Sequence, residues 1–85
     1  MGMAANYQHI TYLRSRNPEV FYVDGSYSAN FIAALKLAVP WKARRWDGDK
    51  KRWEIQREYL DVIKQIARDH FDVVYYGEGG DYIKI

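Results

Sequence analysis

The feature that most constrains the fold is an Asp-Gly pair at residues 47 and 48, set between two short segments that each carry a tryptophan. This pair is a strong signal for a tight reversal between antiparallel strands. Residues 44–46 and 52–56 are therefore predicted to pair as a β-hairpin. Because side chains alternate between the faces of a strand, Trp53 should lie on the apolar face with Trp46 across from it. We expect both tryptophans to point into the core.

Strand-like and helix-like patterns alternate around this hairpin. Segments rich in β-branched and aromatic residues predict strands over residues 7–14, 19–24, 71–76 and 82–85. Apolar residues at helical spacing predict helices over residues 28–39 and 58–70. The first helix should be capped by Ser26 or Ser28 and ended by Pro40. Residues 77–81 contain three glycines and are predicted to form a turn.

The resulting order, ββαββαββ, predicts an α+β fold with two helices on one face of a small antiparallel or mixed sheet. A length of 85 residues suits one domain, over residues 7–85, after a flexible tail over residues 1–6. Hydrophobic residues make up 48% of the chain, which is enough to argue against intrinsic disorder. Because the chain has no cysteine, its core must hold together without disulfides or cysteine-bound zinc.

The formal net charge of +2 hides an uneven distribution along the chain. Residues 36–57 carry a local charge of +5, so the remainder carries −3. Residues 69–81 contain four acidic residues and no lysine or arginine. Such asymmetry governs the choice of partner more than the total charge does, and a basic segment suits a phosphate-bearing partner.

Basic and aromatic side chains are interleaved in and around the hairpin. Lysine and arginine neutralise phosphates, and aromatic rings stack on unpaired bases, so the pattern indicates nucleic-acid binding. Trp41 follows Pro40 in a connection, where an exposed ring is expected. The candidate nucleic-acid-binding residues are Lys42, Arg44, Arg45, Lys50, Lys51, Arg52, Arg57 and Trp41.

Tyrosines on the predicted strands form a second aromatic group, and some of them must face outward. An exposed sheet face of tyrosines would suit a single nucleic-acid strand and a protein partner equally well. The tyrosines concerned are Tyr7, Tyr12, Tyr22, Tyr75 and Tyr76.

No pattern in the sequence predicts catalysis, a metal site or a cofactor. His9 and His70 have no cysteine partner and lack the spacing of a metal-binding helix. The glycines at residues 77–80 lead into a predicted strand, whereas a phosphate-binding loop opens a helix. The sequence also lacks a secretory signal and a membrane-spanning stretch. We expect a cytoplasmic, non-catalytic protein that does not engage membranes.

The hairpin sequence RRWDGDKKRWEI, residues 44–55, resembles the core motif of the HARP domain of HepA-related annealing helicases. That motif has an arginine, a tyrosine or tryptophan, an aspartate, a turn with basic residues, and then a tryptophan and an apolar strand. The resemblance spans about residues 20–71. It implies a module that helps to bind single-stranded or branched DNA without an ATPase motif. It also implies that Trp46 and Trp53 are structural and that the phosphate contacts come from Arg44, Arg45, Lys50, Lys51 and Arg52.

A protein-interaction module is the alternative hypothesis. The chain is short and acidic at its C-terminal end, as expected of a small phage or mobile-element regulator that docks on a host protein. Strand addition at residues 7–14 or 82–85 is a plausible mode of contact, including contact between two copies in a homodimer.

Overall fold

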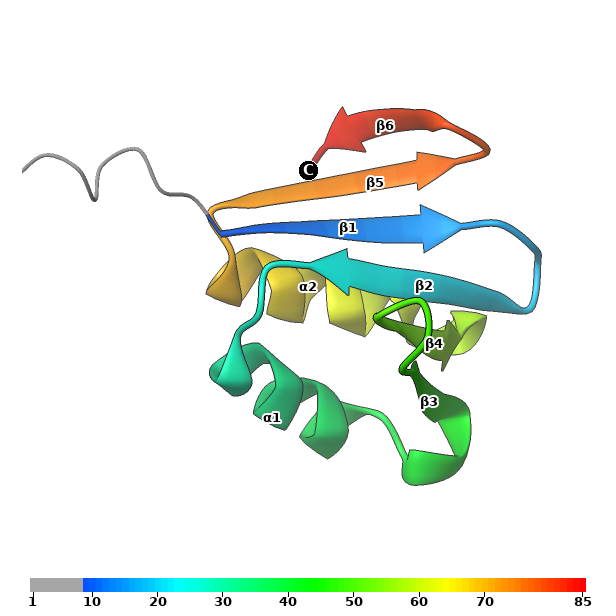
Figure 1. Cartoon of the computed structure of the whole chain (residues 1–85), viewed down its shortest axis with the longest axis vertical. Helices are drawn as coiled ribbons and strands as arrows, with labels where there is room; N and C mark the ends of the chain where they lie inside the picture. The colour runs from blue at the N-terminus through cyan, green and yellow to red at the C-terminus, as the bar shows by residue number, and fades with distance from the viewer. Residues whose placement is uncertain (1–8) are drawn as a thin grey trace, which may run out of the picture.

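The computed structural model describes residues 9–85 and has two layers, a six-stranded sheet and a pair of helices on one of its faces (Figure 1). This architecture confirms the α+β class and the ββαββαββ order. The expected tail over residues 1–6 and the candidate Tyr7 lie outside the described residues. The elements are β1 (Ile10–Ser15), β2 (Val20–Gly25), α1 (Ala29–Ala38), η2 (Trp41–Ala43), β3 (Arg44–Asp47), β4 (Arg52–Gln56), η3 (Arg57–Tyr59), α2 (Leu60–His70), β5 (Val73–Glu78) and β6 (Asp81–Lys84).

The strand order in the sheet is β3-β4-β2-β1-β5-β6. Strands β1 and β5 pair in parallel and all other neighbours pair antiparallel, so the sheet is mixed. This order places the β3–β4 hairpin and the β5–β6 hairpin at opposite edges. It also corrects one prediction: β1 is paired on both sides, so residues 10–15 offer no free edge for strand addition. The free edges belong to β3 and β6.

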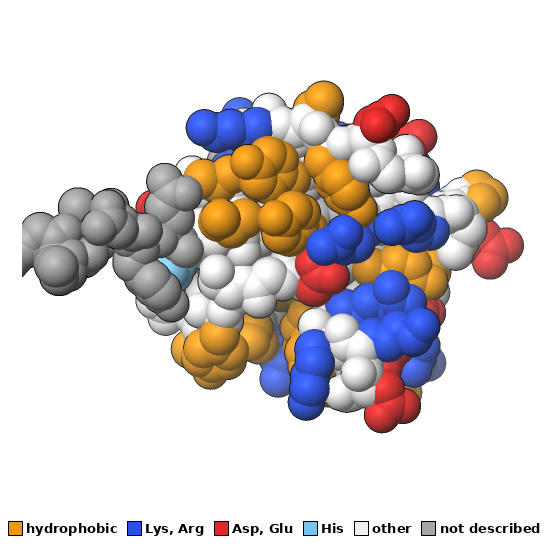
Figure 2. Space-filling model, turned by 45° about the horizontal axis from the view of Figure 1, so that its top comes forward, with side chains coloured by type: hydrophobic (Ala, Val, Ile, Leu, Met, Phe, Trp, Pro, Cys, Tyr) orange, Lys and Arg blue, Asp and Glu red, His pale blue; other side chains and the backbone are white. Residues whose placement is uncertain are grey.

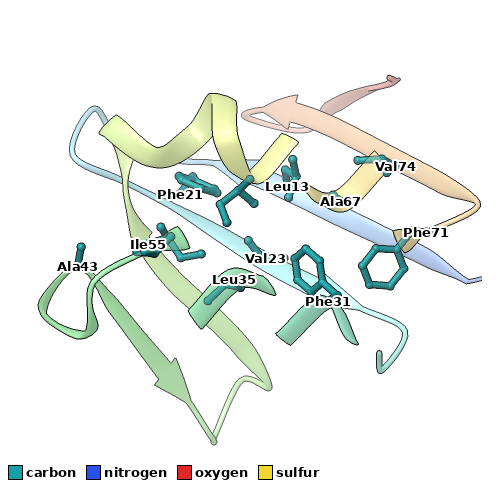
Figure 3. Close-up of a cluster of buried hydrophobic side chains, with 12 residues drawn as sticks. Leu13, Phe21, Val23, Phe31, Leu35, Ala43, Ile55, Ala67, Phe71 and Val74 are labelled. Carbon is teal, nitrogen blue, oxygen red and sulfur yellow. The ribbon is translucent and has the colours of Figure 1, made fainter. Parts of the chain in front are cut away.

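The core lies between the sheet and the two helices. Leu13 and Phe21 point from the central strands toward Leu35 of α1 and Ile63 of α2, and all four are fully buried. Figure 3 shows these layers, with labelled side chains from both helices and from β1, β2 and β4 converging. Because alternate residues of β1 and β2 are buried, the side chains between them point to the face that no helix covers.

Local capping explains where α1 begins. The Ser28 side chain accepts a hydrogen bond from the Phe31 backbone N–H at 3.1 Å, so Ser28 and not Ser26 is the N-cap. The Ser26 hydroxyl instead accepts from the Ile10 N–H at 3.0 Å and ties the end of β2 to β1. Pro40 follows the C-cap residue Val39, as predicted.

The predicted turn over residues 77–81 is confirmed at its centre but is too wide, because β5 continues through Gly77 to Glu78 and β6 begins at Asp81. The reversal is made by Gly79 and Gly80, which both have positive φ angles. Gly77 pairs with Tyr82, and a Cβ atom at Gly77 would lie 2.5 Å from a carbon of the Tyr82 ring. The glycine therefore serves a close cross-strand approach and not a turn.

Candidate nucleic-acid interface

The tip of the β3–β4 hairpin is held by an aspartate. The Asp47 carboxylate accepts hydrogen bonds from the backbone N–H groups of Asp49 and Lys50, at 3.1 and 3.2 Å. Both hydrogen bonds hold the pKa of Asp47 below its usual value, and the bond from the Lys50 N–H has the larger effect. The carboxylate therefore stays ionised at neutral pH and caps the turn, and its contribution to stability is lost as the pH falls through that lowered pKa.

Two lysines occupy the tip. Lys50 and Lys51 are exposed, and neither takes part in an ion pair with any residue of the described range 9–85. Lys51 has a φ angle of 56°, the left-handed conformation that completes the reversal. Both ammonium groups are thus free to meet an external anion.

The three hairpin arginines are placed differently from one another. Arg45 and Arg52 lie on the open face of the sheet: Arg45 pairs with Glu54 at 2.9 Å, and the Arg52 guanidinium lies 3.7 Å from the Tyr22 ring centroid. Arg44 lies on the helix-bearing face, where its Nε donates to the Val39 carbonyl at 3.0 Å. Arg45 and Arg52 are therefore the arginines that extend the basic surface of the turn onto the sheet.

Trp41 and Lys42 lie in η2, where the chain enters β3. Trp41 is 71% exposed, which confirms the expectation of an exposed ring. The Lys42 ammonium lies 5.7 Å from the centre of that ring, within cation–π range. The pair places one more cation and an aromatic face at the base of the hairpin.

Arg57 lies apart from the other candidates, beyond the end of β4 away from the turn. Its guanidinium donates to the Ser15 hydroxyl and to the Asn17 carbonyl, at 3.0 Å for the latter, and lies 3.4 Å from a Glu78 carboxylate oxygen. These contacts join three separate parts of the chain, so the geometry assigns Arg57 a structural role.

Replacing Arg57 should change the stability of the protein but not its affinity for nucleic acid. We expect Arg57→Gln to lower the free energy of unfolding by about 2 kcal/mol, because it leaves the buried Ser15 hydroxyl without its charged partner. Nucleic-acid affinity, measured well below the melting temperature, should stay unchanged. A loss of affinity without a loss of stability would place Arg57 in the interface.

The two hairpin tryptophans share the helix-bearing face, but they are not buried alike. Trp53 is half-buried against the core, as expected, whereas Trp46 is 49% exposed and the expectation of a core residue is wrong for it. Trp46 lies on the edge strand β3, so nothing in the sheet flanks it on one side. The two rings, 5.4 Å apart between centroids, border a groove of about 360 Å³ lined by Tyr27, Ile32, Lys36, Trp46 and Trp53.

The open face of the sheet carries Arg14, Asp24 and Tyr82, which the sequence pattern did not single out. Arg14 in β1 holds the Asp24 carboxylate through two nitrogens, at 2.9 and 3.1 Å, and donates to the Tyr82 hydroxyl at 2.7 Å. Its hydrogen bond to Asp24 raises the pKa of Arg14, so it is always charged. Tyr12, Tyr22 and Tyr75 face the same side. Figure 2 shows hydrophobic side chains gathered on this face, with basic ones beside them.

Tyr76 differs from the other strand tyrosines because it points to the helix-bearing face. It packs against the core, and its hydroxyl donates to Glu78 at 2.7 Å. Burial raises the pKa of the Tyr76 hydroxyl. Of the tyrosines predicted as candidates, Tyr12, Tyr22 and Tyr75 are the ones that the fold brings together.

Comparison with known proteins gives no relatives: no family model, no curated protein and no solved structure matches this chain. Within residues 9–85, no cluster of three or more histidine, aspartate or glutamate side chains could hold a metal ion. No helix in the same range is long and apolar enough to cross a membrane.

Proposed function

We propose that this chain is a cytoplasmic, non-catalytic nucleic-acid-binding module that needs no cofactor and contacts phosphates through the β3–β4 hairpin. The observation that carries the proposal is the pair of exposed turn lysines without ion-pair partners in residues 9–85, flanked by the arginines Arg45 and Arg52. The two turn lysines can meet phosphates without first breaking an internal ion pair.

The strand order supports the proposal because it separates the two charged ends of the chain. The basic hairpin and the acidic residues Glu78 and Asp81 lie at opposite edges of the sheet. Five strand spacings between β3 and β6 amount to about 24 Å. Since this exceeds the Debye length of about 8 Å at physiological salt, the acidic edge repels phosphates at the hairpin only weakly.

The likeness of residues 44–55 to the HARP motif supports the same proposal and favours single-stranded or branched DNA over a plain duplex. The arrangement of basic residues modifies the roles implied by that resemblance. Arg44 lies on the helix-bearing face, away from Arg45 and Arg52, and donates to the Val39 carbonyl. Lys42 therefore takes its place in the set of five cations that we propose for phosphate contact: Lys42, Arg45, Lys50, Lys51 and Arg52.

Salt titration tests the proposal directly. If five cations each neutralise one phosphate, log K for a single strand should fall with log salt at a slope of about −3.5. Fluorescence anisotropy of labelled single-stranded, duplex and forked DNA over a range of salt concentrations measures this slope. A slope near zero, or no binding at low salt, would overturn the proposal.

A second candidate function is a protein-interaction module, such as a phage or mobile-element regulator of a host protein. The groove beside Trp46 favours it, since Tyr27 and Trp46 leave 75% and 49% of their surfaces exposed there. The edge strand β6 could also pair with a partner or with a second copy. A pull-down from lysate compared between the native chain and Trp46→Ser, beside the binding assay, distinguishes the two functions.

A further inference from the structure

The face of the sheet away from the helices is built of aromatic rings and guanidinium groups. Register places Tyr22 of β2 opposite Arg14 of β1, and Tyr12 of β1 opposite Tyr75 of β5. Tyr82 of β6 joins them because Gly77, its partner in β5, has no side chain to hold the ring away. Four tyrosines from four adjacent strands thus form one surface, which we name the tyrosine face: Tyr12, Tyr22, Tyr75 and Tyr82.

These rings are held in place by one another. Tyr12 stacks on Tyr75 with centroids 5.4 Å apart and an angle of 18° between the planes, and it meets the edge of Tyr82 at 5.9 Å. The Arg14 guanidinium lies 4.6 Å from the Tyr12 centroid and 5.3 Å from that of Tyr82. Because these side chains are already ordered, they lose little additional conformational entropy when a ligand stacks on them.

The tyrosine face continues into the basic hairpin. Arg52 is the link, since it reaches from the hairpin to the tyrosine face and its guanidinium lies 3.7 Å from the Tyr22 ring centroid. A chain whose phosphates follow the hairpin would draw the Arg52 guanidinium off the Tyr22 ring and carry its next bases onto that ring and the neighbouring rings of the tyrosine face.

The acidic groups of this face do not oppose a polyanion strongly. Asp24 is bound by Arg14, Glu54 is paired with Arg45, and the Asp47 carboxylate accepts backbone N–H groups of the turn. Arg52, the turn lysines and the exposed Lys84 then remain without an ion-pair partner among residues 9–85. The charge that remains uncompensated is positive, which complements phosphate.

We infer that the tyrosine face is a stacking platform for unpaired bases, so that the ligand of this module is single-stranded nucleic acid. The inference rests on the proposed function and narrows it. A duplex keeps its bases inside and offers this face only phosphates, whereas an unpaired strand offers both phosphates and the flat surfaces of its bases. Aromatic rings on a sheet can hold about two or three bases in this manner.

The test removes rings without removing charge. In the variant Tyr22→Thr with Tyr75→Thr, threonine keeps the strand propensity but cannot stack, and the matched control Tyr22→Phe with Tyr75→Phe keeps the rings. The probes are labelled oligothymidine and a mixed-sequence duplex, each of about 12 nucleotides or base pairs. We expect the threonine variant to bind oligothymidine roughly 100-fold more weakly than the native chain does, because each stacked base contributes about tenfold to the affinity and two rings are removed. Its affinity for the duplex should stay within about twofold of the native value. The phenylalanine control should bind both probes like the native chain, and thermal melts should show all three proteins folded.

The possible outcomes distinguish a failure of the stacking platform from a failure of nucleic-acid binding as such. If the threonine variant keeps its oligothymidine affinity while salt dependence persists, the tyrosine face is not a platform and the hairpin alone binds nucleic acid. An equal loss for both probes would also overturn the inference, because stacking predicts a loss for unpaired bases only. If the native chain binds neither probe at low salt, the proposed function itself fails.

Discussion

Reversing the charge of the two turn lysines, Lys50→Glu with Lys51→Glu, should weaken binding to every nucleic-acid probe by about fivefold or more. Each exposed ion pair is worth about 0.2–1 kcal/mol, and reversal replaces an attraction by a repulsion of similar size. Two reversals therefore cost roughly 1–4 kcal/mol of binding free energy at low salt. The salt slope for a single strand should also become shallower by about 1.4. Anisotropy titrations at several salt concentrations measure both quantities.

A matched control changes the same net charge elsewhere on the protein. Arg16 and Arg68 are exposed, in the β1–β2 connection and in α2, and neither forms an ion pair within residues 9–85. Arg16→Glu with Arg68→Glu should lower the affinity far less than the hairpin variant does. Equal losses would mean that only the overall charge matters, and the hairpin would not be the contact surface. Both variants should melt near the native temperature, because all four side chains are exposed.

Local signals in the sequence were sufficient to predict most of the secondary structure. The hairpin over residues 44–56 depends on an Asp-Gly turn and on alternation, and both act between near neighbours. The two helices depend on apolar spacing and on a serine cap. The error at Gly77 has the opposite origin: a glycine in a strand is explained by the ring that crosses it from β6, and no local pattern distinguishes this from a turn.

The candidate site was predicted less completely, because it depends on the order of the strands. Alternation correctly predicted that Trp46 and Trp53 lie on one face of the sheet. It could not predict that Trp46 is exposed, because this follows from the position of β3 at the edge of the sheet. The tyrosine face needs β1 to pair in parallel with β5, across about 60 residues of intervening chain. Arg14 and Tyr82 meet only because of that pairing, so the pattern around each of them could not indicate their contact.

Substitution of Gly77, which lies inside β5, should strongly destabilise the protein. In Gly77→Ala the new Cβ would lie 2.4 Å from the Asp81 carbonyl oxygen, and this atom belongs to the backbone of β6, so the strand itself must move. We expect a loss of about 2 kcal/mol for alanine and about 3 kcal/mol for valine, the range of overpacked sites. For a domain of this size that lowers the melting temperature by roughly 10–20 °C. Valine favours strands intrinsically, so a greater loss with valine would identify crowding and not propensity as the cause.

The control for this prediction is Gly48→Ala at the hairpin turn. A Cβ there meets only the Trp46 indole nitrogen, at 3.7 Å, which is an ordinary contact, so the melting temperature should change little. The double variant Gly77→Ala with Tyr82→Ala separates the two obstacles, since it removes the ring but leaves the Asp81 carbonyl in place. We expect the double variant to stay destabilised, because the backbone contact requires β6 to shift whether or not the ring is present. If Gly77→Ala melted like Gly48→Ala, β6 would not lie against β5 as closely as the fold requires, and Tyr82 would lose its place beside Arg14 on the tyrosine face.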